Sequence, residues 1–269
     1  MRIDGHTYLD EDKAEALKAY PEQTGLDAAV VLTFAGDEAD EGAPFGGCAS
    51  AERVVEVCKA SSGKLIPFAA FDLASEADIE KKLRALKDAG CRGYGEHRTP
   101  RSISHPRSQA MYEAAGKLEL PVVVHLGLPA SGIHPSVREF GRMVDEHYLT
   151  NFIASGPGFW AHIQQNPPED DPLPTGPIRT AGQINEVLWQ WPNVFADLSG
   201  PWGLNALQRD LDFANSFLKR FWNKIIFGTG FGSRGAGAGG HRALIEKIIN
   251  NREQRLAILG GNLMGLLKM

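Results

Sequence analysis

The feature that most constrains this chain is an eightfold alternation of short apolar runs with amphipathic segments. The clearest apolar run is Pro121–Gly127, PVVVHLG, whose successive valines indicate a strand that is buried on both faces. Similar runs predict further strands, and the full expected set is 2–8, 28–34, 64–71, 91–97, 121–127, 150–156, 193–199 and 224–230. Strands that alternate with helices pair in parallel. The chain is therefore predicted to form a single (β/α)8 TIM barrel, and a doubly wound open sheet is the alternative.

The segments between these runs carry the start and stop signals of helices. Ser50 is expected to cap one helix, and Ser75 with Asp78 fits a capping box for the next helix. Pro21 is expected to end the first helix because proline cannot supply a backbone N–H. The predicted helices span 11–20, 50–60, 75–90, 107–118, 136–148, 181–191, 206–221, 241–250 and 253–267.

No long polar linker interrupts this alternation, so residues 1–269 are expected to be one domain. The main departure is a Pro-rich insert at about 157–179, in which the prolines between Pro167 and Pro177 forbid regular structure. Inserts of this length in a compact domain are usually lids or binding loops, and we expect this one to be lid-like.

Charge and composition exclude several kinds of partner. The net charge of -5 and the pI near 5.9 argue against a nucleic-acid or anionic-membrane partner. No apolar run approaches the roughly 20 residues that span a bilayer, and the acidic start MRIDGHTYLDEDK lacks the pattern of a signal peptide. The three cysteines form no CxxC pattern, which argues against a disulfide framework and a zinc–thiolate site. We therefore expect a cytoplasmic protein whose partner is a small-molecule substrate, with a homo-oligomer possible.

Polar side chains gather at the carboxyl ends of the predicted strands. In a barrel these ends meet at one mouth, where chemistry is carried out. His6 and Tyr8 share a face there because side chains alternate along a strand. The mouth and its loops are expected to hold His6, Tyr8, Asp72, Glu96, His97, Arg98, His125, Ser155, Phe159, Trp160, His162, Asp197, Ser199, Thr229, Gly230 and Arg234.

Seven segments, taken in order, resemble the amidohydrolase-related (amidohydrolase 2) family of the amidohydrolase superfamily. They are IDGHTY, GYGEH, VVVHLG, FIASGPGFWAHI, PNVFADLSG, IIFGTGFG and ILGGNLMGLL, and they cover the chain from Ile3 to Leu267. The resemblance implies a metal-dependent barrel that acts as a hydrolase or decarboxylase. It also implies a ligand set with a His-x-His pair on strand one, histidines on strands five and six, and an aspartate on strand eight.

This chain keeps only part of that implied ligand set. His6 and His125 match two of the histidines, whereas Tyr8, Ser155 and Gly230 stand at the other expected ligand positions. Glu96 lies near a strand-four position that is a ligand in binuclear members. The resemblance thus implies one divalent metal, zinc or manganese, held by His6, His125 and Glu96, or no metal if the substitutions abolish binding. The site is either repurposed or one whose ligands were deliberately replaced.

Three functions remain open from the sequence. The first is hydrolysis or decarboxylation at a residual metal. The second is a metal-free acid–base enzyme, a lyase or a catalyst of elimination or proton transfer, with Glu96 or His125 as base and Tyr8 or His97 as proton donor. The third is a binding protein without catalysis. In each case we expect a small anionic or aromatic ligand, contacted by Asp72, Arg98, Ser155, Phe159, Trp160, Ser199 and Arg234.

Two further patterns at the mouth have competing interpretations. Asp197 is expected to hold loop backbone or a neighbouring side chain rather than to react. The segment 230–235 fits GxGxxG, but glycine-rich sequence continues to Gly240 where a dinucleotide-binding helix should begin. A phosphate or carboxylate cradle that includes Arg234 is therefore the favoured interpretation of this segment.

Overall fold

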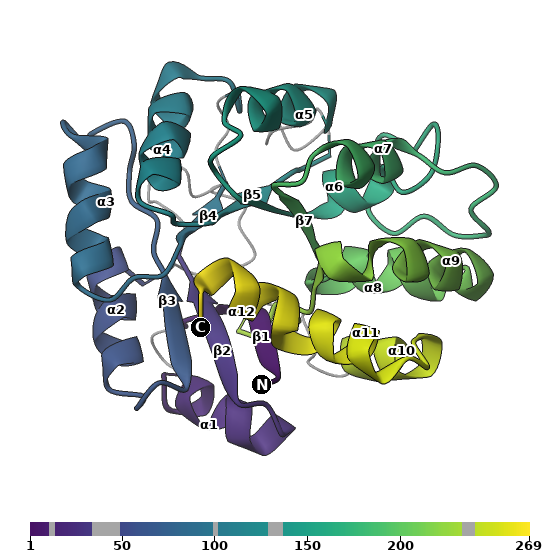
Figure 1. The fold of residues 1–269 in the computed structure, drawn as a ribbon, viewed down its shortest axis with the longest axis horizontal. Helices are drawn as coiled ribbons and strands as arrows, with labels where there is room; N and C mark the ends of the chain where they lie inside the picture. Colours follow the sequence, from purple (N-terminus) through teal and green to yellow (C-terminus); the bar gives the residue numbers. More distant parts are fainter. Residues whose placement is uncertain (11–13, 34–48, 99–101, 129–136, 233–239) are drawn as a thin grey trace.

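The computed structural model describes residues 1–10, 14–33, 49–98, 102–128, 137–232 and 240–269. Eight strands occur within these ranges, and each lies inside a segment that the sequence predicted (Figure 1). They are β1 (Ile3–Tyr8), β2 (Ala28–Leu32), β3 (Leu65–Phe68), β4 (Tyr94–His97), β5 (Val122–His125), β6 (Phe152–Ser155), β7 (Val194–Asp197) and β8 (Ile225–Ile226).

All of the strand pairs are parallel and follow the order of the chain. One sheet has the order β1-β2-β3 and the other has the order β4-β5-β6-β7-β8. Backbone bonds link the two sheets on both sides. Ala69 N–H donates to the Gly93 carbonyl between β3 and β4, and Gly5 N–H donates to the Phe227 carbonyl between β8 and β1. The strands therefore follow one another around the circuit of a (β/α)8 barrel, as the alternation predicted.

Helices surround the strands, most of them on the outside and the last one over the middle of the strand circuit (Figure 1). They are α1 (Ala14–Thr24), α2 (Ala51–Lys59), α3 (Ile79–Asp88), α4 (Pro106–Lys117), α5 (Val137–Glu146), α6 (Pro157–Ala161), α7 (Gln183–Gln190), α8 (Gly200–Gln208), α9 (Leu211–Phe221), α10 (His241–Ile248), α11 (Arg252–Leu256) and α12 (Asn262–Leu267). A 3-10 turn, η3 (Trp222–Lys224), precedes β8, and a π-helical turn, η4 (Ala257–Gly261), joins α11 to α12.

Several helix boundaries differ from the prediction. Pro21 does not end α1 but lies inside it, where it is buried with Leu17 and Tyr20 against the core. The N-cap of α3 is Asp78, which accepts from Lys81 N–H at 2.9 Å, and Ser75 lies outside the helix. The predicted helix 206–221 is two helices, because Asp210 accepts from Phe213 N–H and starts α9 afresh. The Ser50 cap of α2 is confirmed, since its hydroxyl accepts from Arg53 N–H.

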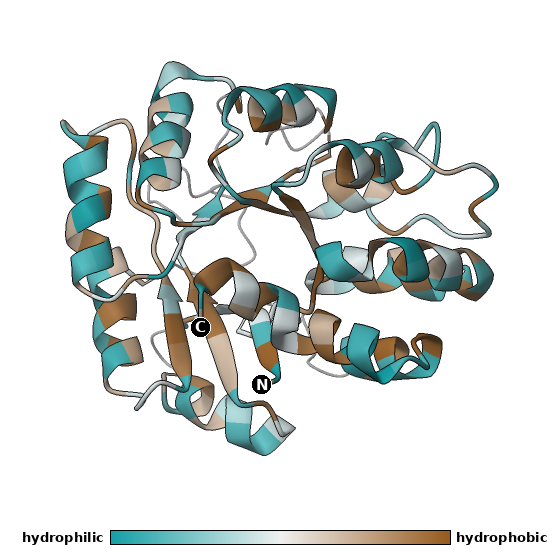
Figure 2. Cartoon of the chain, in the orientation of Figure 1, coloured by the Kyte–Doolittle hydropathy of each residue, from teal (hydrophilic) through white to brown (hydrophobic). Residues whose placement is uncertain are grey.

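The core has two apolar clusters, a large one between strands and helices and a smaller one that joins strand residues such as Ile3 and Val123 to Leu263 of α12. Figure 2 shows the strands as predominantly hydrophobic and the outward helix faces as hydrophilic. Every residue of β2 and β5 is buried, which confirms the prediction of strands covered on both faces. Cys58 and Cys91 are buried and unpaired. No helix in the described ranges is long and apolar enough to cross a membrane.

The Pro-rich insert lies beside α7 and α9 at the edge of the molecule in Figure 1. Two residues between α8 and α9 hold it there. The Asp210 carboxylate accepts from Ile178 N–H at 2.9 Å, and Arg209 donates to the Gly176 carbonyl at 3.1 Å. A lid function for this insert stays a prediction.

Candidate active site

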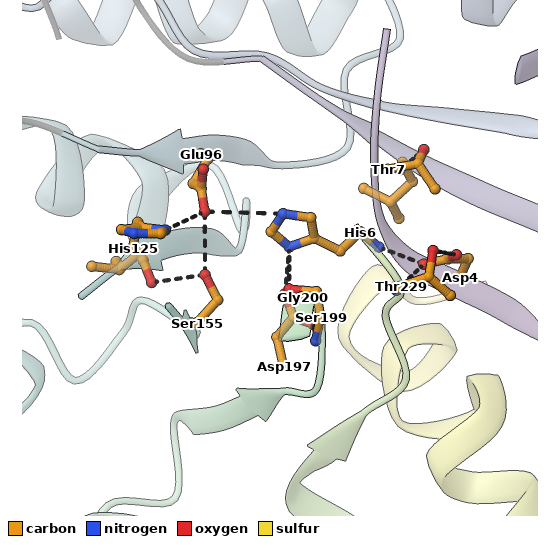
Figure 3. A network of polar contacts seen from close by, with 12 residues as sticks. Asp4, His6, Thr7, Glu96, His125, Ser155, Asp197, Ser199, Gly200 and Thr229 are labelled. Carbon is orange, nitrogen blue, oxygen red and sulfur yellow. Dashed lines mark hydrogen bonds and ion pairs between the residues drawn. The ribbon is translucent and has the colours of Figure 1, made fainter. Parts of the chain in front are cut away.

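Glu96 is the centre of a buried hydrogen-bond network at the carboxyl ends of β1, β4, β5 and β6 (Figure 3). Its Oε1 lies 2.9 Å from His125 Nδ1 and 3.3 Å from Ser155 Oγ. Its Oε2 accepts from the Tyr8 hydroxyl at 2.8 Å. Only 1% of Glu96 is exposed. The carboxylate is thus paired with three donors, which is what burial of a charged group requires.

A second chain of contacts connects Tyr8 to strand β7. The Tyr8 oxygen lies 2.7 Å from His6 Nε2, and His6 Nδ1 lies 2.5 Å from Asp197 Oδ2. Tyr8 and His6 meet because they are two residues apart on β1 and share a face of the strand. The result is a continuous path in which Asp197, His6, Tyr8, Glu96 and His125 each contact the next residue.

The donor in each contact of this path follows from the protons that each residue can carry. Tyr8 has one hydroxyl proton and donates it to Glu96, so the contact with His6 Nε2 requires a proton on that nitrogen. His6 Nδ1 also carries a proton, which it donates to the Asp197 carboxylate. Both ring nitrogens of His6 are therefore protonated, and His6 is a cation between two carboxylates.

The electrostatics agree with this assignment. Burial lowers the pKa of His6, but Asp197 with help from Glu96 and Asp4 outweighs burial, and the pKa is raised above its ordinary value. Burial acts to raise the pKa of Glu96, but His125, His6 and Arg98 outweigh it and hold that pKa well below its usual range. Glu96 is consequently a stabilised anion and a poor base.

His125 is the member of the network best placed to exchange a proton with a ligand. Its Nδ1–H donates to Glu96, and among the described residues its other ring nitrogen, Nε2, has no hydrogen-bond partner. The side chain stands at the carboxyl end of β5 and is slightly exposed. A carboxylate that holds Nδ1–H fixes the tautomer whose Nε2 can accept a proton.

Asp197 and Ser199 support the far end of the network. Asp197 accepts from Ser199 N–H at 2.8 Å and from the Ser199 hydroxyl at 2.9 Å. The hydroxyl also lies 3.1 Å from His6 Nδ1. The prediction that Asp197 holds backbone and a neighbouring side chain is confirmed, although its contact with the His6 ring was not predicted.

Asp4 forms a separate anchor beneath the site. Its carboxylate accepts from Tyr20 and Thr229 hydroxyls, each at 2.6 Å, and from His6 N–H at 3.0 Å. Burial raises its pKa against these hydrogen bonds. Asp4 thereby fixes the backbone of β1 at His6 to the loop that follows β8.

The residues present do not fit the metal that the resemblance implied. His6 Nε2 and Glu96 Oε2 contact the Tyr8 hydroxyl, and His125 Nδ1 contacts Glu96 directly. Glu96 is thus bonded directly to His125, and the Tyr8 hydroxyl lies between Glu96 Oε2 and His6 Nε2. Across the described ranges, no group of three or more His, Cys, Asp or Glu side chains is placed to hold a metal ion. Gly230, at an expected aspartate position, has no side chain, and its N–H donates to the His6 carbonyl.

Several predicted site residues lie elsewhere. His97 follows Glu96 on β4 and therefore points to the opposite face, where its ring packs against Tyr112 of α4. Phe159 and Trp160 are buried in the core, and the Trp160 indole donates to the Asp197 carbonyl. Trp160 thus contacts the end of β7 that carries Asp197, and neither ring is exposed.

The remaining predicted binding residues are less informative. Asp72 accepts from Ala74 N–H at 2.6 Å within its own loop. Arg98 is almost buried and lies close enough to Glu96 to lower the pKa of that carboxyl. His162 contacts the Gly158 carbonyl through Nδ1. Arg234 lies outside the described residues, and so does most of the predicted cradle.

Sequence reasoning missed Trp202, in the first turn of α8. Its ring meets the His125 ring edge-to-face, with centroids 6.0 Å apart. The available signal was an aromatic residue directly after the predicted strand 193–199.

The comparison with known families settles the classification. A family model described as amidohydrolase matches residues 3–262. The chain belongs to the amidohydrolase family. The comparison with curated proteins finds no match.

Solved structures with the same fold cover almost all of this amidohydrolase chain. A probable 2-pyrone-4,6-dicarboxylic acid hydrolase from Acinetobacter baumannii, with citric acid bound, is 13% identical with a TM-score of 0.68, over 100% of this chain and 99% of that one. An uncharacterised TIM-barrel protein from Bordetella bronchiseptica is 16% identical with a TM-score of 0.67, over 99% and 98%. A dihydroxybenzoic acid decarboxylase from Polaromonas sp. JS666, with bound manganese and the inhibitor 2-nitroresorcinol, is 14% identical with a TM-score of 0.59, over 99% and 96%. At these identities the likeness shows the barrel fold alone.

Proposed function

We propose that this protein is a metal-independent acid–base enzyme that transfers a proton in a small, anionic, aromatic or pyrone-like carboxylic acid. The observation that carries the proposal is the Glu96–His125 pair, in which a buried carboxylate holds His125 Nδ1–H and leaves Nε2 as a base. The coarser statement, membership of the amidohydrolase family, rests on the family match.

His125 is the general base of the proposed step. A C–H bond of the substrate breaks while an N–H bond forms at Nε2, and the electron pair stays on the substrate carbon and its adjoining carbonyl as an enolate. Glu96 stabilises the imidazolium that results. Return of a proton to another carbon of this enolate then completes an isomerisation.

Tyr8 is the proton donor that returns a proton to the substrate. Its hydroxyl gives up a proton and takes another from His6 Nε2, which lies 2.7 Å away. His6 is left neutral, with Nδ1–H still donated to Asp197. The chain thus holds a base and a proton source on either side of Glu96.

Two observations support the substrate class. The described mouth brings His6 and Arg98 close to Glu96, so cationic groups surround the site. Solved neighbours carry names of enzymes for carboxylic acids, namely a 2-pyrone-4,6-dicarboxylic acid hydrolase and a dihydroxybenzoic acid decarboxylase.

The test is a panel of pyrone and hydroxybenzoate carboxylates, incubated in D2O with chelator-treated protein. NMR follows loss of substrate C–H signals and formation of products. We expect exchange or turnover that is insensitive to chelator and that falls about 10²–10⁴-fold in His125→Ala, the usual contribution of a general base. His147→Gln, a change at a histidine outside the network, is the matched control and is expected to keep full activity.

Metal-dependent hydrolysis or decarboxylation is the second candidate. It is favoured by the family match and by the distance of 3.9 Å between His6 Nε2 and Glu96 Oε1. The same assay separates the two candidates. Activity that appears only after addition of zinc or manganese would replace our proposal with this one. Saturable binding without exchange or turnover would instead indicate a binding protein.

A further inference from the structure

The indole N–H of Trp202 is a buried donor that the protein leaves without an acceptor. The Nε1 atom is inaccessible to solvent and has no hydrogen-bond partner among the described residues. The protein provides for other indoles, since Trp160 donates to the Asp197 carbonyl at 2.8 Å and Trp191 faces Asp145 at 3.4 Å. Leaving a buried donor unpaired costs about 1–3 kcal/mol, and such groups are rare in native proteins. An acceptor from outside the chain would remove this cost.

The backbone places the indole ring that carries this donor beside His125. Trp202 lies in the first turn of α8, which follows β7 at the mouth, and its ring stands at 89° to the His125 ring. The indole approaches Gly200 so closely that a Cβ at that position would lie 2.9 Å from Nε1 and 2.5 Å from Cε2. Gly200 also has a φ of +74°, a conformation that other residues rarely adopt. The position of the indole over Gly200 is therefore built into the backbone.

The chemistry of the missing acceptor follows from its surroundings. An indole N–H can only donate, so its partner must be an acceptor such as an oxygen. Helix α8 has no side-chain cap, because the Ser199 hydroxyl that would cap it contacts Asp197 and His6 instead. The positive end of α8 therefore favours a negatively charged acceptor next to Trp202.

We propose that Trp202 is a substrate-binding residue whose indole N–H donates to a carboxylate oxygen of the substrate held against His125. This inference rests on the proposed function for the identity of the reaction, but it concerns binding and can be tested without turnover. It adds a specificity determinant on β7–α8 to the acid–base groups on β1, β4 and β5.

The experiment is a titration of ¹⁵N-labelled protein with benzoate, followed through the indole N–H resonances. The Trp202 indole signal is assigned as the one that is missing from the spectrum of Trp202→Phe. We expect benzoate to shift the Trp202 indole signal, and benzyl alcohol, which has the same ring without the carboxylate, to leave it in place. Trp202→Phe keeps an aromatic ring but removes the N–H donor, and we expect it to weaken benzoate binding about tenfold or more. Trp189→Phe, at an indole that is 71% exposed, is the control and should bind as the parent does.

Each outcome decides the inference separately from the proposed function. A Trp202 signal that shifts while no carboxylate reacts would sustain the inference and remove the proposed reaction. Turnover with an unmoved Trp202 signal would sustain the proposed reaction and overturn the inference. An unmoved signal at saturating benzoate, equal affinity in the Trp202→Phe and Trp189→Phe variants, or no benzoate binding at all would overturn the inference.

Discussion

Position 96 illustrates why the role of a site residue depends on its neighbours more than on its type. From the sequence, Glu96 and His125 were equal candidates for the base. In the structure Glu96 accepts from Tyr8 and Ser155 and holds Nδ1–H of His125. These donors stabilise its charge, and the proposed function therefore gives Glu96 the role of orienting the base, His125.

Removal of the Tyr8 hydroxyl is predicted to destabilise the protein. Tyr8→Phe leaves Glu96 Oε2 and His6 Nε2 without the group that lies between them, 2.8 and 2.7 Å away. We expect a loss of about 1–3 kcal/mol in unfolding free energy, measured by urea denaturation at pH 7. Tyr148→Phe, at a ring that is 72% exposed, should unfold as the parent does. Equal stability of the two variants would contradict the network.

The protonated state of His6 predicts a pH dependence of stability. Its folded-state pKa is raised, so the stability that it contributes is fully present below its unfolded pKa of about 6.5 and is lost as pH rises through the higher folded value. We compare urea denaturation of the parent and of His6→Gln between pH 5 and pH 9. The parent's advantage should shrink as pH rises, and an advantage that is constant or grows would count against a cationic His6.

The sequence could supply the members of this network but not their contacts. His6, Tyr8, Glu96 and His125 were all predicted from their places at strand ends. The bond from His6 to Asp197 joins residues 191 positions apart, and nothing local encodes it. His97 was misplaced because a strand end does not reveal which of two successive residues faces the mouth.

At the scale of elements, short helices depend on capping carboxylates. The predicted Ser75–Asp78 capping box had the right residues but the wrong start, because Asp78 itself caps α3. The predicted helix 206–221 is interrupted at Asp210, where the second helix, α9, begins. The periodic spacing of apolar residues continues across such a break. The position of a cap depends on backbone angles, which this spacing does not predict.

Asp210 is predicted to stabilise two elements at once. Its Oδ1 accepts from Phe213 N–H to cap α9, and its Oδ2 accepts from Ile178 N–H in the Pro-rich insert. Asp210→Ala should cost about 1–2 kcal/mol, and it should speed proteolysis of the insert. Asp78→Ala removes only a cap. It should lower stability without a change in cleavage of the Pro-rich insert, and identical cleavage in both variants would refute the link to the insert.

At the scale of the whole molecule, the eightfold alternation predicted the barrel. It did not predict how the two sheets join at the two junctions, β8 to β1 and β3 to β4, which we call the seams. β8 has only two residues, and single bridges join the segment after it to β1 and join β3 to the segment before β4. Two glycines permit the close approach at these seams. A Cβ at Gly5 would lie 2.6 Å from Ile226, and one at Gly93 would lie 2.4 Å from the Phe68 ring.

Alanine at either seam glycine is predicted to destabilise the whole barrel. Gly5→Ala and Gly93→Ala insert a methyl group into packed strands, at a cost of about 1–3 kcal/mol each. Gly265 in α12 has open space where a methyl group would lie, with no neighbouring atom within 4 Å. Gly265→Ala should therefore leave stability unchanged or raise it by about 0.5–1 kcal/mol. Thermal unfolding measures the stability of all three variants. Equal changes in stability for the seam variants and for Gly265→Ala would argue against close packing at the seams.

The central claim is that His125 is a base held by Glu96 in a site without metal, and ¹⁵N NMR of the histidine rings tests it most directly. In chelator-treated protein we expect the neutral form of His125 to carry its proton on Nδ1 and none on Nε2. Addition of zinc or manganese should not change that state, and Glu96→Ala should abolish the preference for Nδ1–H. A proton on Nε2 in the parent protein, or stoichiometric metal binding that changes the His6 and His125 signals together, would contradict the account.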